Sequence, residues 1–212
     1  MEKTTNKTAP VGTEQFTRHR VATAISFVAN PLFIAIPTFL IIALYAASNP
    51  LQGLLWWGIT VLGFSLAPLL FIARGVRSGR YSDRHVSLRE QRLIPLLFGM
   101  GCVVIVFLTL LSLRASPPLL ATVTAALITL AIATLVTRFW TKISFHLVGI
   151  AGTATVFTLL FGIVAVLLYP LVFLVAWARW RVQAHTVGQA CAGTVLAVVV
   201  TLVVFWLFGL GL

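Results

Sequence analysis

The chain has 212 residues, of which 60% are hydrophobic and only 9% are charged, and its formal net charge is +11. A mean hydropathy of +1.06 excludes an ordinary soluble domain, and the lack of period-2 alternation excludes a transmembrane β-barrel. Apolar runs near or above about 18 residues recur, long enough to cross a hydrocarbon layer of about 30 Å. The sequence therefore predicts an all-α, polytopic transmembrane helical bundle.

The first twenty residues form a polar, basic N-terminal arm, and residues 21–212 are predicted to form a single transmembrane domain. The apolar run Val21–Ala47 is far longer than a signal-peptide core of roughly 7–15 residues. We therefore expect a retained first helix, bent at Asn30-Pro31 or at Pro37.

Four further spans are clear, and one stretch is ambiguous. Between His146 and Ala178 a single helix would be about 50 Å long, which exceeds the bilayer thickness. Two short helices of roughly 15 residues, hinged near Gly162 and with Tyr169-Pro170 bending the second, fit better. The total is about six or seven spans, and seven is the preferred count. The clear spans after the first are Leu54–Ala73, Leu93–Leu113, Leu119–Thr137 and Val187–Gly211.

The spans distribute the basic residues unequally. With seven spans, residues 1–20, 74–92, 138–146 and 179–186 share one side of the membrane. Of the 15 Lys and Arg residues, only Arg114 lies on the other side. The positive-inside rule then places the basic side in the cytoplasm. We expect the membrane to be the plasma (inner) membrane.

Three polar clusters lie on this basic side. Asp83–Pro95 contains Arg89 and Arg92, Lys142–His146 contains Ser144, and Ala178–Gln189 contains Arg179 and His185. Each has an ordinary alternative, namely an arginine that extends to the interface, an interhelical histidine hydrogen bond, or a patch for anionic lipids. Because polar groups in a membrane protein are costly, their coincidence on one side predicts a common site.

Phosphoryl transfer explains this set of residue types. It requires fixed cations around the phosphate oxygens, a nucleophile such as a neutral imidazole, and an acid for the leaving group. The only acids near the clusters are Asp83 and Glu90, too few for a two-magnesium site. Cys102 and Cys191 lie inside predicted spans and indicate neither a disulfide nor a zinc site. We therefore expect no metal and no cofactor.

These clusters resemble the type 2 phosphatidic acid phosphatase (lipid phosphate phosphatase) superfamily, whose motifs are Lys-x6-Arg-Pro, Pro-Ser-Gly-His and Ser-Arg-x5-His-x3-Asp. Ala178-Arg179-x5-His185-x3-Gln189 is similar to the third motif, and Ile143-Ser144-Phe145-His146 to the second. The first is matched least, with His85 seven residues before Arg92 and Pro95 three after it. The likeness covers about residues 80–205.

The resemblance implies an integral-membrane hydrolase that removes phosphate from a lipid or isoprenoid phosphate or diphosphate through a phosphohistidine. The substrate and the membrane are its expected partners; we expect no nucleic acid, and the sequence indicates no protein partner. His185 is the predicted nucleophile, His146 the general acid, and Gln189 the residue that holds the tautomer of His185. The predicted phosphate ligands are Arg89, Arg92, Lys142, Ser144 and Arg179.

Two departures leave alternatives open. Gln189 replaces the motif's Asp, and Phe145 replaces its Gly. A non-catalytic protein that binds or transports anionic lipids on the same scaffold is the alternative that the missing Asp favours. A prenyltransferase that acts on aromatic substrates is a weaker idea, because that class needs two Asp-rich magnesium motifs and this chain has a single Asp.

Overall fold

The structure, a computed structural model, describes residues 11–83, 86 and 88–211, without the side chains of residues 11–16 and 89. Within these residues the chain is entirely helical, and the predicted all-α class is confirmed. The elements in chain order are α1 (Val11–Val28), α2 (Pro31–Ala46), α3 (Pro50–Val61), the π-helix η1 (Leu62–Leu66), α4 (Ala67–Arg77), the 3₁₀ helix η2 (Arg89–Gln91), α5 (Leu93–Ser112), α6 (Pro117–Phe139), α7 (Phe145–Phe161), the 3₁₀ helix η3 (Ile163–Leu168), α8 (Tyr169–Arg181) and α9 (Val187–Leu207).

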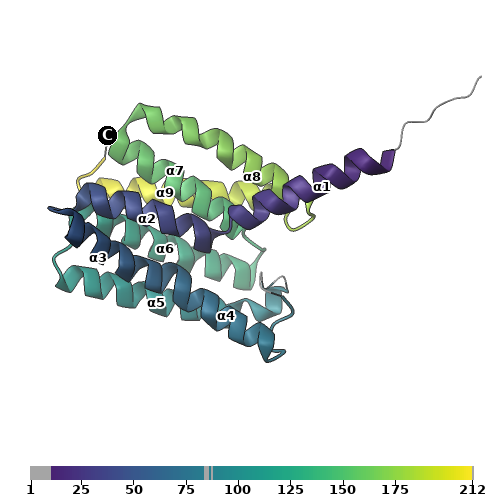
Figure 1. Ribbon diagram of the computed structural model, residues 1–212, viewed down its shortest axis with the longest axis horizontal. Coiled ribbons are helices and arrows are strands. Elements are labelled where there is room, and N and C mark those ends of the chain that lie inside the picture. The colour runs from purple at the N-terminus through teal and green to yellow at the C-terminus, as the bar shows by residue number, and fades with distance from the viewer. Residues whose placement is uncertain (1–10, 84–85, 87, 212) are drawn as a thin grey trace, which may run out of the picture.

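The long helices lie side by side in a bundle, with α9 packed on α6 and α7, α5 on α6, and α2 on α3 (Figure 1). The fully buried core includes Ile42, Leu110, Leu119 and Phe205. Many large apolar side chains are instead exposed on the outer faces of the helices. Such a surface suits a bilayer, because lipid tails are as apolar as the side chains that face them. The protein is an integral membrane protein.

Five apolar helical segments are long enough to cross a membrane, and the bent pair α1–α2 makes six if it is one span. The count overlaps the predicted six or seven at six, and these segments do not establish the preferred seven. Helix α7, with 17 residues, is shorter but runs beside α9 (Figure 1). The five segments are Pro50–Arg77, Leu93–Ser112, Pro117–Phe139, Ile163–Arg181 and Val187–Leu207.

The first predicted span is two helices that meet at an angle of 49°. The break falls at Asn30, whose side chain caps α2 by accepting a hydrogen bond of 3.0 Å from the backbone N–H of Leu32. Pro31 follows at the start of α2, where a proline costs no hydrogen bond. Pro37, the other predicted bend, lies inside α2 without ending it. Helix α1 continues past the bundle (Figure 1).

The predicted hinge at Gly162 is present, because this residue ends α7 with a φ of +79°, which favours glycine. Tyr169-Pro170 lies inside the following apolar segment, Ile163–Arg181, as expected, at the point where a 3₁₀ helix passes into α8. Residues Ile163–Leu168 form a 3₁₀ helix, and Pro170 lies in the first turn of α8, where its missing N–H is not needed.

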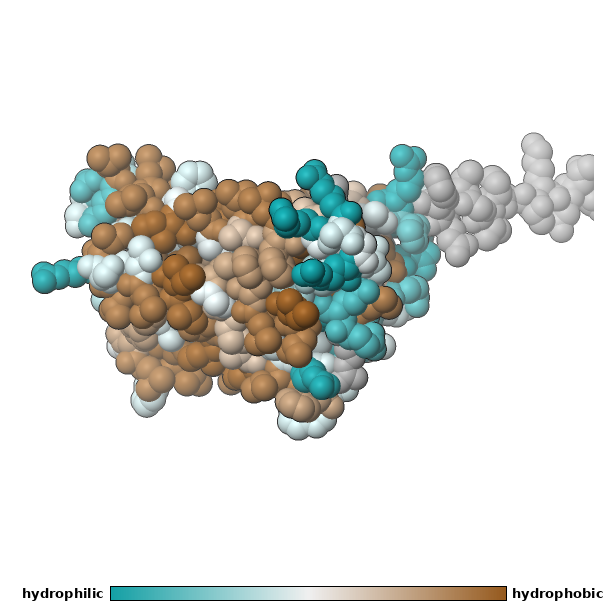
Figure 2. Space-filling model, turned by 90° about the horizontal axis from the view of Figure 1, so that it is seen from below, coloured by the Kyte–Doolittle hydropathy of each residue, from teal (hydrophilic) through white to brown (hydrophobic). Residues whose placement is uncertain are grey.

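The segments that carry the three polar clusters meet at one end of the bundle, which we call the polar end. It contains the end of α4, the α6–α7 and α8–α9 loops, and the start of α2 (Figure 1). Hydrophilic residues gather there on the face drawn in Figure 2, next to a hydrophobic body. A side chain at Gly193 would contact the Ser144 carbonyl oxygen at 2.9 Å, so glycine allows α9 to approach the start of α7 closely.

Candidate functional site

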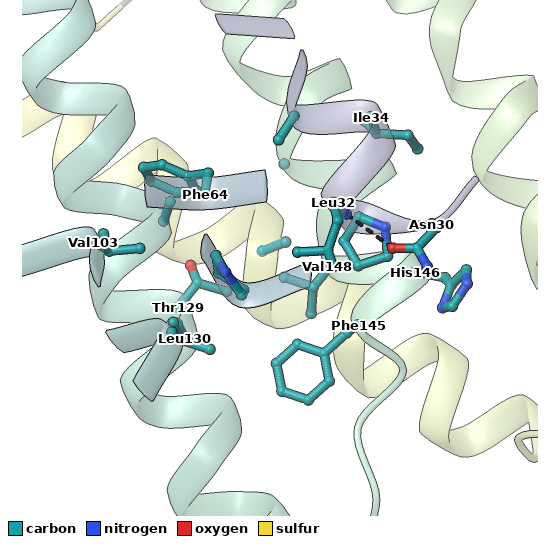
Figure 3. Close-up of a pocket in the computed structure, with 18 of the residues that line it drawn as sticks. Asn30, Leu32, Ile34, Phe64, Val103, Thr129, Leu130, Phe145, His146 and Val148 are labelled. Atoms are coloured by element: carbon teal, nitrogen blue, oxygen red, sulfur yellow. Dashed lines mark hydrogen bonds between the residues drawn. The ribbon is translucent and has the colours of Figure 1, made fainter. Parts of the chain in front are cut away.

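A cavity of about 320 Å³ opens at the polar end and extends into the bundle. Four of the predicted site residues line it, with at least one from each predicted cluster and both histidines among them: Arg92, His146, Arg179 and His185. Most of the other lining residues are apolar or Thr side chains from α2, α5, α6, α7 and α9, several of which are drawn in Figure 3. The fold therefore brings segments far apart in the sequence around one cavity.

His185 lies in the α8–α9 loop and is 7% exposed. Its Nδ1 is 3.2 Å from Oε1 of Gln189. An amide oxygen only accepts hydrogen bonds, so Nδ1 carries the proton and Nε2 of the neutral ring has a lone pair. The contact expected between Gln189 and His185 is confirmed.

Gln189 is itself fixed from two directions. Its Oε1 also accepts from the backbone N–H of Thr186 at 3.3 Å, which completes a capping box at the start of α9. Its Nε2 donates to Thr141 Oγ1 at 3.2 Å, which ties α9 to the α6–α7 loop. The Thr-x-x-Gln spacing signals the cap in the sequence. Nothing in the sequence indicates Thr141 as a partner.

Two arginines line the cavity near His185, and Lys142 acts on it by its charge. Arg179 is 7% exposed, and its Nε has no hydrogen-bond partner among the described residues. Arg92 donates from Nε to the Val86 carbonyl oxygen at 2.9 Å. Burial lowers the pKa of Lys142, and Arg92 and Arg179 lower it further, against Glu90 and Asp83. These cations repel one another, so an anion bound among them would be stabilised.

The same surroundings keep His185 neutral. Its pKa falls from 6.5 to about 4, first because of burial and then because of the positive charges of Arg179, Arg92 and Lys142. The hydrogen bond to Gln189 acts in the opposite direction. At neutral pH the imidazole is therefore uncharged, the form required of a nucleophile.

His146 lies in the first turn of α7 and is also 7% exposed. Its Nε2 is 3.0 Å from the carbonyl oxygen of Ser26 in α1, so this nitrogen is the donor. In Figure 3 the ring lies beside Asn30, whereas Phe145 points the other way, toward Leu130. Any proton that His146 gives to a ligand must therefore come from Nδ1.

The remaining predicted ligands are placed differently. Ser144 is fully buried under α9 and does not line the cavity, and its Oγ has no hydrogen-bond partner within the described part of the chain. Lys142 is half-buried and acts on the cavity by its charge. The side chain of Arg89 and the whole of His85 lie outside the described residues.

The described residues contain no group of three or more His, Cys, Asp or Glu side chains placed to hold a metal ion. Comparison of the chain with protein-family models, with curated proteins and with solved structures finds no match. The site is therefore characterised by its own geometry: a neutral histidine, a buried guanidinium without a partner for its Nε–H among the described residues, and an apolar cavity.

Proposed function

We propose that the protein is an integral-membrane phosphatase that hydrolyses a lipid or isoprenoid phosphate or diphosphate through a phosphohistidine. The observation that carries the proposal is Arg179, a buried guanidinium whose Nε–H has no acceptor among the described residues and which lines the same cavity as the neutral His185. A buried N–H donor without an acceptor is costly, and a phosphoryl oxygen would supply an acceptor for this Nε–H.

In this mechanism Nε2 of His185 attacks phosphorus, and the bond between phosphorus and the leaving oxygen breaks. His146, protonated on both nitrogens, gives its Nδ1 proton to that oxygen. Its Nε2–H remains hydrogen-bonded to the carbonyl oxygen of Ser26. Water then attacks the phosphohistidine, His146 takes a proton from that water, and orthophosphate and neutral His185 are released. Gln189 holds Nδ1–H of His185 throughout.

The positive charge for the transition state comes from Arg92, Lys142 and Arg179, so hydrolysis is expected to proceed without a metal ion. The concentration of Lys and Arg at the polar end supports a site that faces the cytoplasm at the plasma membrane. The resemblance of the second and third polar clusters to lipid phosphate phosphatase motifs supports the same reaction.

A non-catalytic protein that binds anionic lipids is the second candidate. The observation that favours it is Gln189, because a neutral amide stabilises an imidazolium less than a carboxylate does. Both candidates require the cation cluster, but only the phosphatase requires His185 to be chemically active.

The test is phosphate release from purified protein with farnesyl phosphate, farnesyl diphosphate, dodecyl phosphate and phosphatidate, in excess EDTA. We expect release that His185→Gln abolishes and that orthovanadate inhibits, since vanadate forms a five-coordinate analogue of the transition state. Loss of activity in EDTA with recovery in magnesium would overturn the mechanism. Binding of these compounds without any release would establish the lipid-binding candidate.

A further inference from the structure

The cavity extends well beyond the charged residues at its opening. It is lined from Arg92, directly before α5, to Val103 on α5, and on α7 from Phe145 to Val156. Each pair is eleven residues apart (103 − 92 and 156 − 145), which corresponds to about 16 Å of helix at 1.5 Å per residue. The cavity thus runs lengthwise through the bundle and away from the phosphate site.

The deep part of the cavity offers little to a polar ligand. Phe39, Phe64 and Val156 contribute apolar walls. The hydroxyl of Thr122 donates to the Pro118 carbonyl oxygen at 2.8 Å. The hydroxyl of Thr38, which pairs with Thr153, likewise donates to a backbone carbonyl of its own helix. Because the hydroxyls of Thr38 and Thr122 are satisfied within the protein and most of the wall is apolar, the space matches a hydrocarbon better than water.

Two glycines on opposite walls keep this space open. Gly99 of α5 and Gly152 of α7 are each seven residues (99 − 92 and 152 − 145) from the opening, or about 10 Å along the helix axis. A Cβ at Gly99 would meet nothing within 4 Å, and one at Gly152 would reach only the Ala197 Cβ, at 3.9 Å. A larger side chain at either position would therefore project into the cavity.

The inner end of the cavity is closed by packed residues. Ile42 lies one turn beyond Phe39 on α2, and Leu119 lies one turn beyond Thr122 on α6. Both are fully buried in the hydrophobic core, and neither lines the cavity. A chain longer than the cavity would have to displace them, at the cost of core packing.

We propose that this cavity binds the hydrocarbon chain of the substrate inside the bundle, and that the preferred substrate has a single chain about as long as a farnesyl or dodecyl group. The inference rests on the proposed function for the position of the phosphate. Charge complementarity sets the orientation, because the cations lie at one end and the apolar walls at the other. A second acyl chain has no corresponding space in this cavity.

The test compares Gly99→Leu and Gly152→Leu with Gly101→Leu. Gly101 lies two residues from Gly99 on α5 but is exposed and does not line the cavity. A Cβ at Gly101 would also meet nothing within 4 Å, so this position is a matched control. Each variant is assayed in nanodiscs with octyl, dodecyl and hexadecyl phosphate. Ratios of kcat/KM to wild type cancel the partitioning of each substrate into the bilayer.

For wild type we expect kcat/KM to rise from octyl to dodecyl phosphate and not to rise further with hexadecyl phosphate. Gly99→Leu and Gly152→Leu should lower kcat/KM for dodecyl phosphate at least about tenfold more than for octyl phosphate. The reason is that each methylene group that can no longer be buried lowers affinity about fourfold. Gly101→Leu should change neither value. Two cavity variants on different helices separate a blocked cavity from a folding defect in one of them.

Binding of octyl- and dodecylphosphonate, which are not hydrolysed, is measured on the same four proteins by calorimetry. Chain-length dependence of binding without any phosphate release would refute the phosphatase and retain the chain site. Release with the same chain-length profile in all four proteins would overturn the chain site and retain the phosphatase. Higher kcat/KM for phosphatidate than for dodecyl phosphate would also overturn the single-chain preference.

Discussion

His185 and His146 are equally buried, each 7% exposed, but they are held by different parts of the molecule. Gln189, four residues away, fixes His185 through a side chain. Ser26, at a separation of 120 residues, fixes His146 through a backbone carbonyl of α1. A substitution at Gln189 changes the hydrogen bond to His185 directly. The hydrogen bond to His146 comes from a backbone carbonyl, so it changes only if α1 packs differently. This contrast suits a nucleophile of fixed geometry and an acid that depends on the rest of the fold.

The largest expected effect separates the two histidines by role. His185→Gln removes the attacking nitrogen, so turnover should fall roughly 10⁴-fold or more, in the range typical for loss of a nucleophile. Phosphate release measured under single-turnover conditions checks this. Activity within tenfold of wild type would assign His185 to binding alone.

His146→Gln should have an effect that depends on the leaving group. Loss of a general acid costs about 10²–10⁴-fold, and the cost should appear with dodecyl phosphate, whose alkoxide needs a proton. Farnesyl diphosphate loses a phosphate, a better leaving group, and should be slowed much less. The ratio of kcat for the two substrates is the measurement. Equal losses on both would make His146 a structural residue of the α1–α7 contact.

The buried arginine and its neighbour two residues along α8 give a matched pair. Arg179→Gln should lower kcat/KM by about 10–100-fold, the value of a charge-assisted hydrogen bond or two, and should raise Tm because it removes a costly buried cation. Arg181 is also in the last turn of α8, but it does not line the cavity, and Arg181→Gln should change kcat/KM little. Similar losses of activity in both variants would place the anion elsewhere.

Gln189 should produce the smallest effects, and they are best seen as a function of pH. The pKa of His185 is about 4, so the imidazole is neutral above that value, and the acid limb of kcat/KM should lie near pH 4 and not near 6.5. Gln189→Glu and Gln189→Asp should hold or raise kcat and move this limb to higher pH, because a carboxylate favours the imidazolium. Gln189→Leu should lower kcat about tenfold for lack of the hydrogen bond.

The same shift predicts how stability depends on pH. Because the folded pKa of His185 lies below its unfolded value of 6.5, the unfolded chain binds the extra proton first. Stability should therefore fall as pH drops from about 6.5 to about 4, and His185→Gln should flatten that part of the curve. Thermal melts across this range test the sign. If the dependence of stability on pH is the same in His185→Gln as in wild type, a group other than His185 takes up the proton.

The helices and the contact between His185 and Gln189 can be predicted because both depend on local sequence. Apolar runs longer than about 18 residues define spans, and a separation of four residues places two side chains within reach. Glycine at 162 likewise signals its own turn. The proline at 170 also marks the first turn of α8, where its missing N–H costs no hydrogen bond.

The features of the site that could not be predicted depend on contacts between segments distant in the sequence. The motif predicts that Ser144 binds phosphate, but close packing of α9 at Gly193 buries it away from the cavity. The Ser26 carbonyl that holds His146 has no sequence signature, because every residue carries a carbonyl. The apolar cavity is defined by the faces that several helices turn toward one another, and the amino-acid sequence of any single helix does not reveal it.

The Nε–H of Arg179, which has no partner among the described residues, also bears on how a reaction cycle ends. Orthophosphate offers that group the same oxygen acceptors as the phosphoryl ester, but it has no chain to occupy the apolar cavity. In the proposed reaction the product would therefore be held by charge alone, while the next substrate would bind by charge and by its chain. We expect departure of orthophosphate to limit the cycle when free phosphate is abundant, and long-chain substrates to displace it more readily than short ones.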